Sequence, residues 1–304
     1  MSSDSFTEQA QPDTTRYVSR EDIRDLMQAR NGRASLMLAM NWLSIILTFA
    51  VPILWTNPFT IVLAILFLGG RMLGLGVLNH ECAHRSFFSS PAANDFVGQW
   101  LTGAPLNVSV YAYRKVHMRH HRFAGSPDDP DQVFVKDYPI TQARLRRKLW
   151  RDVSGQTGWR DLKFQMSRFS WQRNHPWVIF HVVLLSLLTL VGAPWAYAMW
   201  WAAELFVYPA ILRIRQIGEH GIAADRNNTD VRMHTGTTLV SWWQRWLLAP
   251  NYVNYHVEHH RYAGVPNYNL PRLHKLLAQA GYFEDHSCLT HGYSGVLRRA
   301  VAVA

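Results

Sequence analysis

The chain contains long apolar runs separated by basic, polar segments. Residues 36–56 form an uncharged apolar run, and residues 59–79 form a second one that only Arg71 interrupts. Because about 20 apolar residues are needed to cross a bilayer core, each run is long enough to be a transmembrane helix. The short uncharged connector between them predicts a helical hairpin.

A third apolar run covers residues 176–213 and is too long for a single crossing. It is interrupted by His181, Glu204 and Arg213, and Gly192-Ala193-Pro194 lies near its middle. Gly and Pro mark turns, so we expect two spans here, at about 176–191 and 195–214. The pattern therefore predicts an all-α integral membrane protein with four transmembrane helices in two hairpins.

The distribution of charge predicts the orientation of these helices. The chain carries 31 Lys and Arg and a net charge of +10, yet neither hairpin connector carries a charge. The positive-inside rule then places both termini and the basic segment 113–175, a predicted helical cap, in the cytoplasm. We favour a bacterial inner membrane over the endoplasmic reticulum. Such a basic face suits anionic headgroups or an acidic protein, and no separate basic stripe indicates nucleic acid.

The remaining segments predict one membrane domain with two tails. We expect a disordered tail over residues 1–18, a single domain over 19–281 and a C-terminal tail over 282–304. Ser19-Arg20-Glu21-Asp22 resembles the start of a capped helix. Residues 92–112 look interfacial or re-entrant, and the Trp-rich segment 239–254 suits an amphipathic helix at the headgroups.

Three histidine boxes lie beside the apolar runs. They read His80-Glu81-Cys82-Ala83-His84, His117-Met118-Arg119-His120-His121 and His256-Val257-Glu258-His259-His260. Residues i and i+4 share a helix face, so His80 and His84 can reach one ion together. Adjacent histidines diverge by about 100°, so the pairs that end the other two boxes can serve two neighbouring ions. Eight imidazoles exceed the capacity of one ion, which predicts two; imidazole suits Fe, Zn, Cu and Ni.

At these positions the chain resembles the membrane-bound fatty acid desaturase superfamily, over about residues 40–280. The likeness rests on NHECAHRSFF, on HMRHH with SPDDPD shortly after it, and on NYHVEHHRYAGVPNYNLPRLH. It implies a four-helix membrane fold with cytosolic boxes and a diiron centre, although an overexpressed sample can carry zinc instead. The implied ligands are the eight box histidines and one at the end of the fourth span: His80, His84, His117, His120, His121, His220, His256, His259 and His260.

Other polar residues are candidates to support these ligands. Gln216 precedes His220 by four residues; related acyl desaturases carry an Asn there that reaches a metal through water, and the longer Gln puts that role in doubt. Carboxylates commonly orient a metal-bound imidazole through its other N–H. The candidates from this reasoning, together with the histidine of LPRLH, are Glu81, Glu258, Asp129, Asp131 and His274.

Arg71 and Glu204 are ionisable residues inside apolar spans. Such residues usually face the interior of a helix bundle and pair there, and their distances from the helix ends place them at similar depths. We expect them to meet and to shape the substrate channel. The alternative is that Arg71 extends to the cytoplasmic interface while Glu204 lies near the opposite one.

The resemblance implies O2-dependent desaturation of a fatty acyl lipid. An unactivated C–H bond is too inert for acid–base chemistry, whereas a redox metal with O2 can break it. Because the chain has no GxGxxG fingerprint, electrons are expected from a separate, acidic carrier such as a ferredoxin or cytochrome. A diiron hydroxylase or ketolase of a lipid, alkane or carotenoid is the alternative. A histidine-rich metal transporter is disfavoured, because transport needs polar groups at the membrane midplane.

Overall fold

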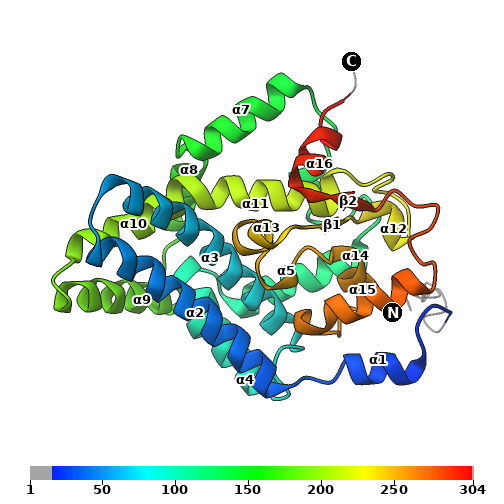
Figure 1. The fold of residues 1–304 in the computed structure, drawn as a ribbon, viewed down its shortest axis with the longest axis horizontal. Coiled ribbons are helices and arrows are strands. Elements are labelled where there is room, and N and C mark those ends of the chain that lie inside the picture. Colours follow the sequence, from blue (N-terminus) through cyan, green and yellow to red (C-terminus); the bar gives the residue numbers. More distant parts are fainter. Residues whose placement is uncertain (1–15, 303–304) are drawn as a thin grey trace, which may run out of the picture.

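The computed structural model describes residues 16–302 (Figure 1), and the mostly helical fold that the sequence predicts is confirmed. One small sheet is added to it. Strand β1 (Thr237–Leu239) pairs in parallel with β2 (Leu289–His291). The predicted N-terminal tail lies almost entirely outside the described residues.

Helices α2 (Asn31–Leu54) and α3 (Pro58–His84) form the first predicted hairpin. Pro58 is the first residue of α3, a position at which the missing backbone N–H costs no helical hydrogen bond. The Asn57 side chain caps the helix by accepting a hydrogen bond from the Thr60 N–H at 3.1 Å. Among the described residues, these are the two helices that are long and apolar enough to cross a membrane.

The second predicted hairpin corresponds to α9 (Trp171–Leu190) and a chain of shorter helices. These are η3 (Pro194–Ala196), α10 (Tyr197–Ala202), the π-helix η4 (Ala203–Val207), α11 (Tyr208–Gln216) and the π-helix η5 (Ile217–Gly221). The predicted turn at Gly192 is present, with φ 74°. Because π-helices interrupt the last part, it does not form a single long α-helix, and the third and fourth spans remain a prediction.

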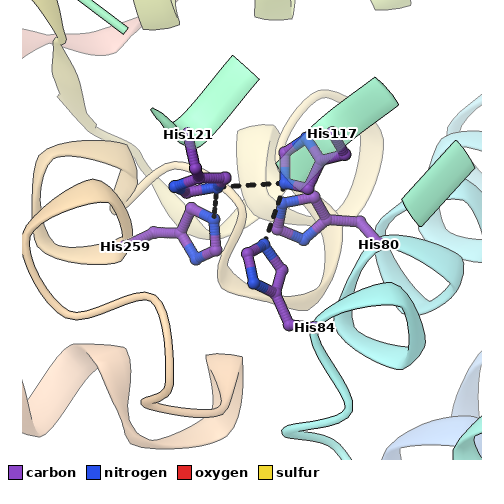
Figure 2. A group of neighbouring side chains, drawn as sticks. All are labelled: His80, His84, His117, His121 and His259. Carbon is purple, nitrogen blue, oxygen red and sulfur yellow. Dashed lines mark hydrogen bonds between the residues drawn. The ribbon is translucent and has the colours of Figure 1, made fainter. Parts of the chain in front are cut away.

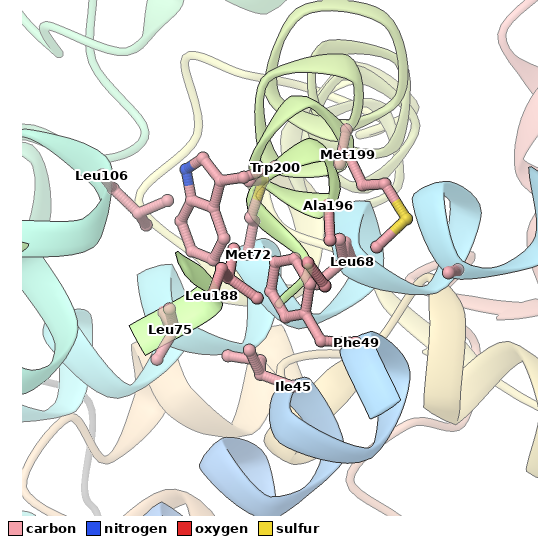
Figure 3. Packing of buried hydrophobic residues seen from close by; sticks show 13 residues of the cluster. Ile45, Phe49, Leu68, Met72, Leu75, Leu106, Leu188, Ala196, Met199 and Trp200 are labelled. Carbon is pink, nitrogen blue, oxygen red and sulfur yellow. The ribbon is translucent and has the colours of Figure 1, made fainter. Parts of the chain in front are cut away.

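Helix α3 is the centre of the packing. Its apolar face meets α2, α9 and α10 in a cluster that includes Phe49, Met72 and Trp200 (Figure 3). Two glycines let its backbone approach its neighbours: a Cβ on Gly70 would lie 2.8 Å from the Leu247 carbonyl oxygen, and one on Gly74 would overlap Asn41. The small residues of α3 therefore bring distant segments together around one helix.

The rest of the chain consists mostly of short helices, among them those that carry the second and third histidine boxes. Its elements before α9 are α4 (Pro91–Phe96), the π-helix η1 (Val97–Gly103), η2 (Ala104–Leu106), α5 (Val110–Phe123), α6 (Gln132–Val135), α7 (Gln142–Val153) and α8 (Gln156–Ser167). Those after η5 are α12 (Val231–His234), α13 (Trp242–Leu247), η6 (Pro250–Tyr252), α14 (His256–Arg261), η7 (Asn267–Asn269), α15 (Leu270–Gln279) and α16 (Gly292–Arg299).

Near the N-terminus, α1 (Arg20–Leu26) begins where the sequence predicts a cap. Ser19 accepts a hydrogen bond from the Asp22 amide at 3.0 Å. In Figure 1, α1, α12 and α15 lie at one end of the molecule, and α9 and α10 lie at the other. The first part of the predicted second hairpin therefore lies at the opposite end of the long axis from α1 and α15.

Two segments differ from expectation in detail. The amphipathic helix predicted over 239–254 is reduced to α13, because Leu239 belongs to β1 and Asn251 adopts a left-handed φ of 55°. The predicted C-terminal tail carries β2 and α16, and Tyr293, Val296 and Ala300 are buried in an apolar cluster with Ile211 of α11. The domain boundaries themselves remain a prediction.

Candidate metal centre

The nine histidines singled out in the sequence converge from four elements. Helix α3 supplies two, α5 three, η5 one and α14 three. They divide into two clusters, and within each cluster the candidate ligand nitrogens lie within 4.8 Å of one another. The clusters are composed as follows: His80, His84, His117, His121 and His259 form the first, and His120, His220, His256 and His260 form the second.

In the first cluster, five imidazole rings face one another (Figure 2). The Nε2 atom of His117 lies 2.9 Å from that of His84 and 3.0 Å from that of His121. The Nε2 atoms of His121 and His259 are also 3.0 Å apart. The rings thus direct nitrogens to a common point from α3, α5 and α14.

The second cluster has the same kind of geometry with four rings. His256 Nε2 lies 3.0 Å from His220 Nε2 and 3.2 Å from His260 Nε2. His120 Nε2 lies 3.2 Å from His260 Nε2. His220 reaches this cluster from η5, a π-helix; such turns often occur at functional sites.

The division between clusters follows the helical repeat. On α5, His117 and His121 are four residues apart and share the first cluster, whereas His120 points to the second. On α14, His256 and His260 share the second cluster, whereas His259 points to the first. The rotation of about 100° per residue therefore lets one short helix serve two sites.

The nitrogen positions fit a metal ion in each cluster. Two nitrogens that bind one ion at a right angle, each about 2.1 Å away, lie about 3.0 Å apart, which agrees with the spacings above. The Nε2 atom of His80 is buried and has no hydrogen-bond partner among the described residues. A metal would use that lone pair, and a buried polar atom without any partner is otherwise unfavourable.

Burial also keeps most of these rings in the form that binds metal. It lowers the pKa of His117 and His259 well below the ordinary value, and neighbouring histidines lower it further. The pKa values of His121, His256 and His260 are lowered in the same way. Neutral imidazole is the ligating form, so these residues are ready to coordinate without losing a proton.

Two of the predicted carboxylates orient a box histidine. The Nδ1–H of His80 donates to Glu81 Oε1 at 3.0 Å, and Glu81 Oε2 accepts from the Asn267 amide at 2.9 Å. The Nδ1–H of His120 donates to Asp129 Oδ1 at 2.7 Å, with Asp131 Oδ2 3.8 Å from the same nitrogen. Burial opposes a charge on His120, but these acids raise its pKa overall.

Glu258 lies elsewhere than predicted. Among the described residues its carboxylate contacts His274 and Thr237 rather than a box imidazole: His274 Nδ1 donates to one oxygen, and Thr237 Oγ1 donates to the other at 2.5 Å. The reason is that Glu258 follows His256 by two residues on α14 and so points away from the side that carries His256 and His260. Glu258 and His274 thus link α14 to α15 and β1.

Two supports of the second cluster were not singled out from the sequence. Glu219 Oε1 lies 3.6 Å from His256 Nδ1 and accepts from Arg215 Nε at 2.6 Å. The Nδ1–H of His220 donates to the carbonyl oxygen of His234 at 3.1 Å. Glu219 could have been found from the sequence, because it is next to His220 as Glu81 is next to His80. The backbone carbonyl of His234 could not, because every residue type has one.

A cavity of about 320 Å³ lies beside the clusters. Leu73, Leu106 and Tyr208 contribute apolar walls, and His120 and His256 border it at the histidine end. Gln216 also lines this cavity, next to the second cluster. The arrangement places an apolar compartment directly against imidazoles, which suits an alkyl substrate.

The predicted meeting of Arg71 and Glu204 does not occur among the described residues. Arg71 Nη2 donates instead to the carbonyl oxygen of Trp246, and its guanidinium lies 5.3 Å from the Trp246 ring centroid. Glu204 Oε2 is buried without a hydrogen-bond partner. Glu204 lies in η4, whose π-helical turn alters the angular register assumed for a regular α-helix. Neither residue lines the cavity beside the clusters.

Comparison with known proteins identifies related enzymes. The chain is 25% identical over 269 residues to the sn-1 oleoyl-lipid 12-desaturase of Synechocystis sp., covering 80% of this chain and 73% of that protein. It is 23% identical to the dihydrorhizobitoxine desaturase of Bradyrhizobium elkanii, over 74% of this chain and 68% of that protein. A beta-carotene ketolase of Paracoccus sp. is 27% identical over 67% of this chain and 76% of its own length.

The family model for fatty acid desaturases matches residues 55–292, which include all three boxes and His220. The match covers well over half of the chain. This protein is therefore an oxidoreductase that belongs to the fatty acid desaturase family.

Proposed function

We propose that the protein is a membrane-bound diiron enzyme that desaturates an acyl chain of a membrane lipid, using O2 and electrons from a separate carrier. The observation that carries this proposal is the apolar cavity whose histidine end borders two imidazole clusters. The sn-1 oleoyl-lipid 12-desaturase relative supports a lipid-linked substrate. The proposed ligands are the nine histidines of the two clusters.

Iron bound in the clusters would supply, with O2, the oxidising power to remove hydrogen from unactivated CH2 groups. Loss of two hydrogens from adjacent carbons, together with two external electrons and two protons, converts one O2 to two waters. The residues of the chain contribute positioning. Glu81 and Asp129 fix the orientation of His80 and His120, and the cavity holds two neighbouring carbons near the clusters.

The apolar walls have a second role, which is to exclude water. Leu73 and Leu106 contribute hydrocarbon surface, and the buried Arg215–Glu219 pair adds its charges at the histidine end. A dry compartment protects reactive oxygen chemistry from stray protons. Gln216 faces the same space, and we propose that its amide holds a water beside the second cluster.

We further propose a four-span topology with both termini and the metal centre in the cytoplasm. Supporting it, α2 and α9 expose large apolar side chains, including Leu47, Leu54, Val182 and Leu190. These surfaces suit lipid, because a soluble protein rarely leaves so many exposed together. Labelling of single cysteines introduced at Gly192 and Arg146 tests this: a reagent that cannot cross the membrane should label Gly192→Cys from outside and Arg146→Cys only after permeabilisation.

An acidic electron carrier is the proposed protein partner. Helices α7 and α8 carry exposed basic residues, among them Arg146, Arg147 and Arg160. A positive face accelerates encounter with an acidic carrier in a salt-dependent manner. Turnover with a purified ferredoxin should therefore slow as ionic strength rises, whereas a neutral chemical reductant should show little salt dependence.

The decisive test combines metal and product analysis. After loading with iron, the full-length protein should hold about two tightly bound ions per chain, and at most one would contradict a dinuclear centre. Lipids from a host expressing the chain should contain acyl groups with one additional double bond, absent with a His84→Ala variant.

Oxygen insertion is the second candidate function, because the Paracoccus relative is named as a beta-carotene ketolase. The same lipid extracts distinguish the two. Desaturation removes two hydrogens from the product mass, whereas hydroxylation or ketolation adds an oxygen atom.

A further inference from the structure

A second pocket lies on the other side of α3 from the metal centre. It occupies about 450 Å³ between α2, α3, α13 and η6. Three arginines from three different elements line it: Arg33, Arg71 and Arg245. Three cations in one pocket repel one another unless an anion is supplied.

None of these arginines pairs with a carboxylate anywhere in residues 16–302; each contacts a neutral group. Arg33 Nη1 donates to the Asn269 side-chain oxygen at 3.0 Å, and Arg71 donates to the Trp246 carbonyl. The Arg245 guanidinium lies 4.9 Å from the Tyr252 ring centroid. The positive charge of the pocket is therefore uncompensated by the part of the chain that the structure describes.

Arg71 is the deepest of the three. It is only 4% exposed, and its Nε is buried without a hydrogen-bond partner. Burying a guanidinium with an unused donor is unfavourable unless a ligand accepts from it. Arginine donors arranged around one space match the oxygens of a phosphate group.

One wall of the pocket is apolar and adjoins the proposed membrane surface, whereas Asn41, Asn251 and Tyr268 add polar groups elsewhere. Leu36, Met37 and Met40 of α2 form one wall, and Leu36 is 63% exposed. On the neighbouring α13, Trp242 and Trp246 are exposed, as aromatic residues at a headgroup layer commonly are. The pocket thus offers cations beside hydrocarbon, which matches a ligand with an anionic head and an apolar tail.

We propose that this pocket binds the phosphate of an anionic glycerophospholipid from the cytoplasmic leaflet, as a resident lipid distinct from the substrate. Leu73 faces the cavity beside the histidines, and Arg71 faces this pocket; two residues apart on a helix, they point about 200° from each other. Helix α3 therefore separates the two spaces. The bound lipid would link α2, α3 and α13 at the membrane surface, independently of the metal chemistry.

Native mass spectrometry of the full-length protein in neutral detergent tests this. The probes are dioleoyl phosphatidylglycerol, dioleoyl phosphatidylcholine, dioleoylglycerol and inorganic phosphate. We expect one tightly bound phosphatidylglycerol and at least about tenfold weaker binding of the other three. The double variant Arg33→Gln/Arg245→Gln should weaken phosphatidylglycerol binding by about tenfold or more, because each loses a charge-assisted hydrogen bond. These two residues are chosen because both are more accessible than Arg71.

The matched control is Arg146→Gln/Arg147→Gln, which removes the same charge from the exposed face of α7 and should bind the lipid as the wild type does. Unchanged affinity in the pocket variant overturns the proposal. Equal loss in both variants would show general attraction to a basic surface instead. Binding of inorganic phosphate as tight as that of the lipid would show an anion site that does not recognise lipid.

Discussion

The two histidine clusters have the same chemistry but different surroundings. In the first, the carboxylate that contacts a ring within residues 16–302 is Glu81, which accepts from His80. In the second, Asp129 and Asp131 adjoin His120, and Glu219 adjoins His256. The second cluster also borders the cavity with three of its four rings, whereas only His117 of the first does so. Carboxyl groups and contact with the cavity are therefore concentrated on one side of the centre.

This contrast indicates that ligand type alone does not determine what each ion would do. Carboxylates behind imidazoles make them stronger electron donors and hold their rings in place. We expect the surroundings of the second cluster to control the reaction. The first cluster is expected mainly to bind the other metal ion. The experiments below test that asymmetry.

The largest effect is expected from removing a ligand. His84→Ala in the first cluster and His220→Ala in the second should each abolish turnover and reduce the tightly bound iron from about two ions to about one. Elemental analysis of the purified variants measures this. His291→Ala, which removes an exposed histidine on β2, serves as the control. Retention of two ions by either ligand variant would contradict its assignment.

A smaller effect is expected from removing a carboxylate behind a ligand. Asp129→Asn should weaken metal binding or activity by about 10- to 100-fold, and more than Glu81→Gln does, because the second cluster borders the cavity. Metal titration and single-turnover product yield report the two effects. Asp128→Asn is the control, since Asp128 is the exposed neighbour of Asp129. An equal loss in Glu81→Gln would remove the proposed asymmetry.

Gln216 should have a more moderate effect. Gln216→Leu is expected to lower turnover by about tenfold while leaving the melting temperature nearly unchanged, because Gln216 lines the cavity. Gln216→Asn keeps an amide and should retain more activity. Wild-type turnover in Gln216→Leu would assign the residue a structural role only.

The smallest effect concerns Arg71 and Glu204. Because Arg71 contacts Trp246 and the two residues form no ion pair, Arg71→Met and Glu204→Gln should change stability additively, within about 0.5 kcal/mol. Thermal unfolding of both single variants and the double variant in detergent measures this. A double variant clearly more stable than the sum would show that the two residues interact after all.

The sequence was most informative where function depends on local spacing. The i, i+4 intervals in His117–His121 and His256–His260 predict shared faces, and the structure gathers these rings accordingly. The hairpin of α2 and α3 follows as directly from apolar run length. The ligand roles of the histidines remain a prediction until metal is measured.

Tertiary contacts account for what could not be predicted. Arg71 and Trp246 are 175 residues apart, and a backbone carbonyl has no residue-type signature. Likewise, His220 depends on the His234 carbonyl for its orientation. The pairing of Arg71 with Glu204 was inferred from the distance of each residue from the end of its helix. That distance gives the position along the helix axis, but not the direction in which the side chain points around it.

The sharing of α5 and α14 by both clusters has a consequence for assembly. Because each helix holds candidate ligands of both clusters, a shift of one cluster would displace the other. The distance between two bound ions would then be set by two short helices rather than by flexible loops. Occupation of one cluster would stiffen the scaffold of its neighbour, so the second ion should enter a site already organised by the first.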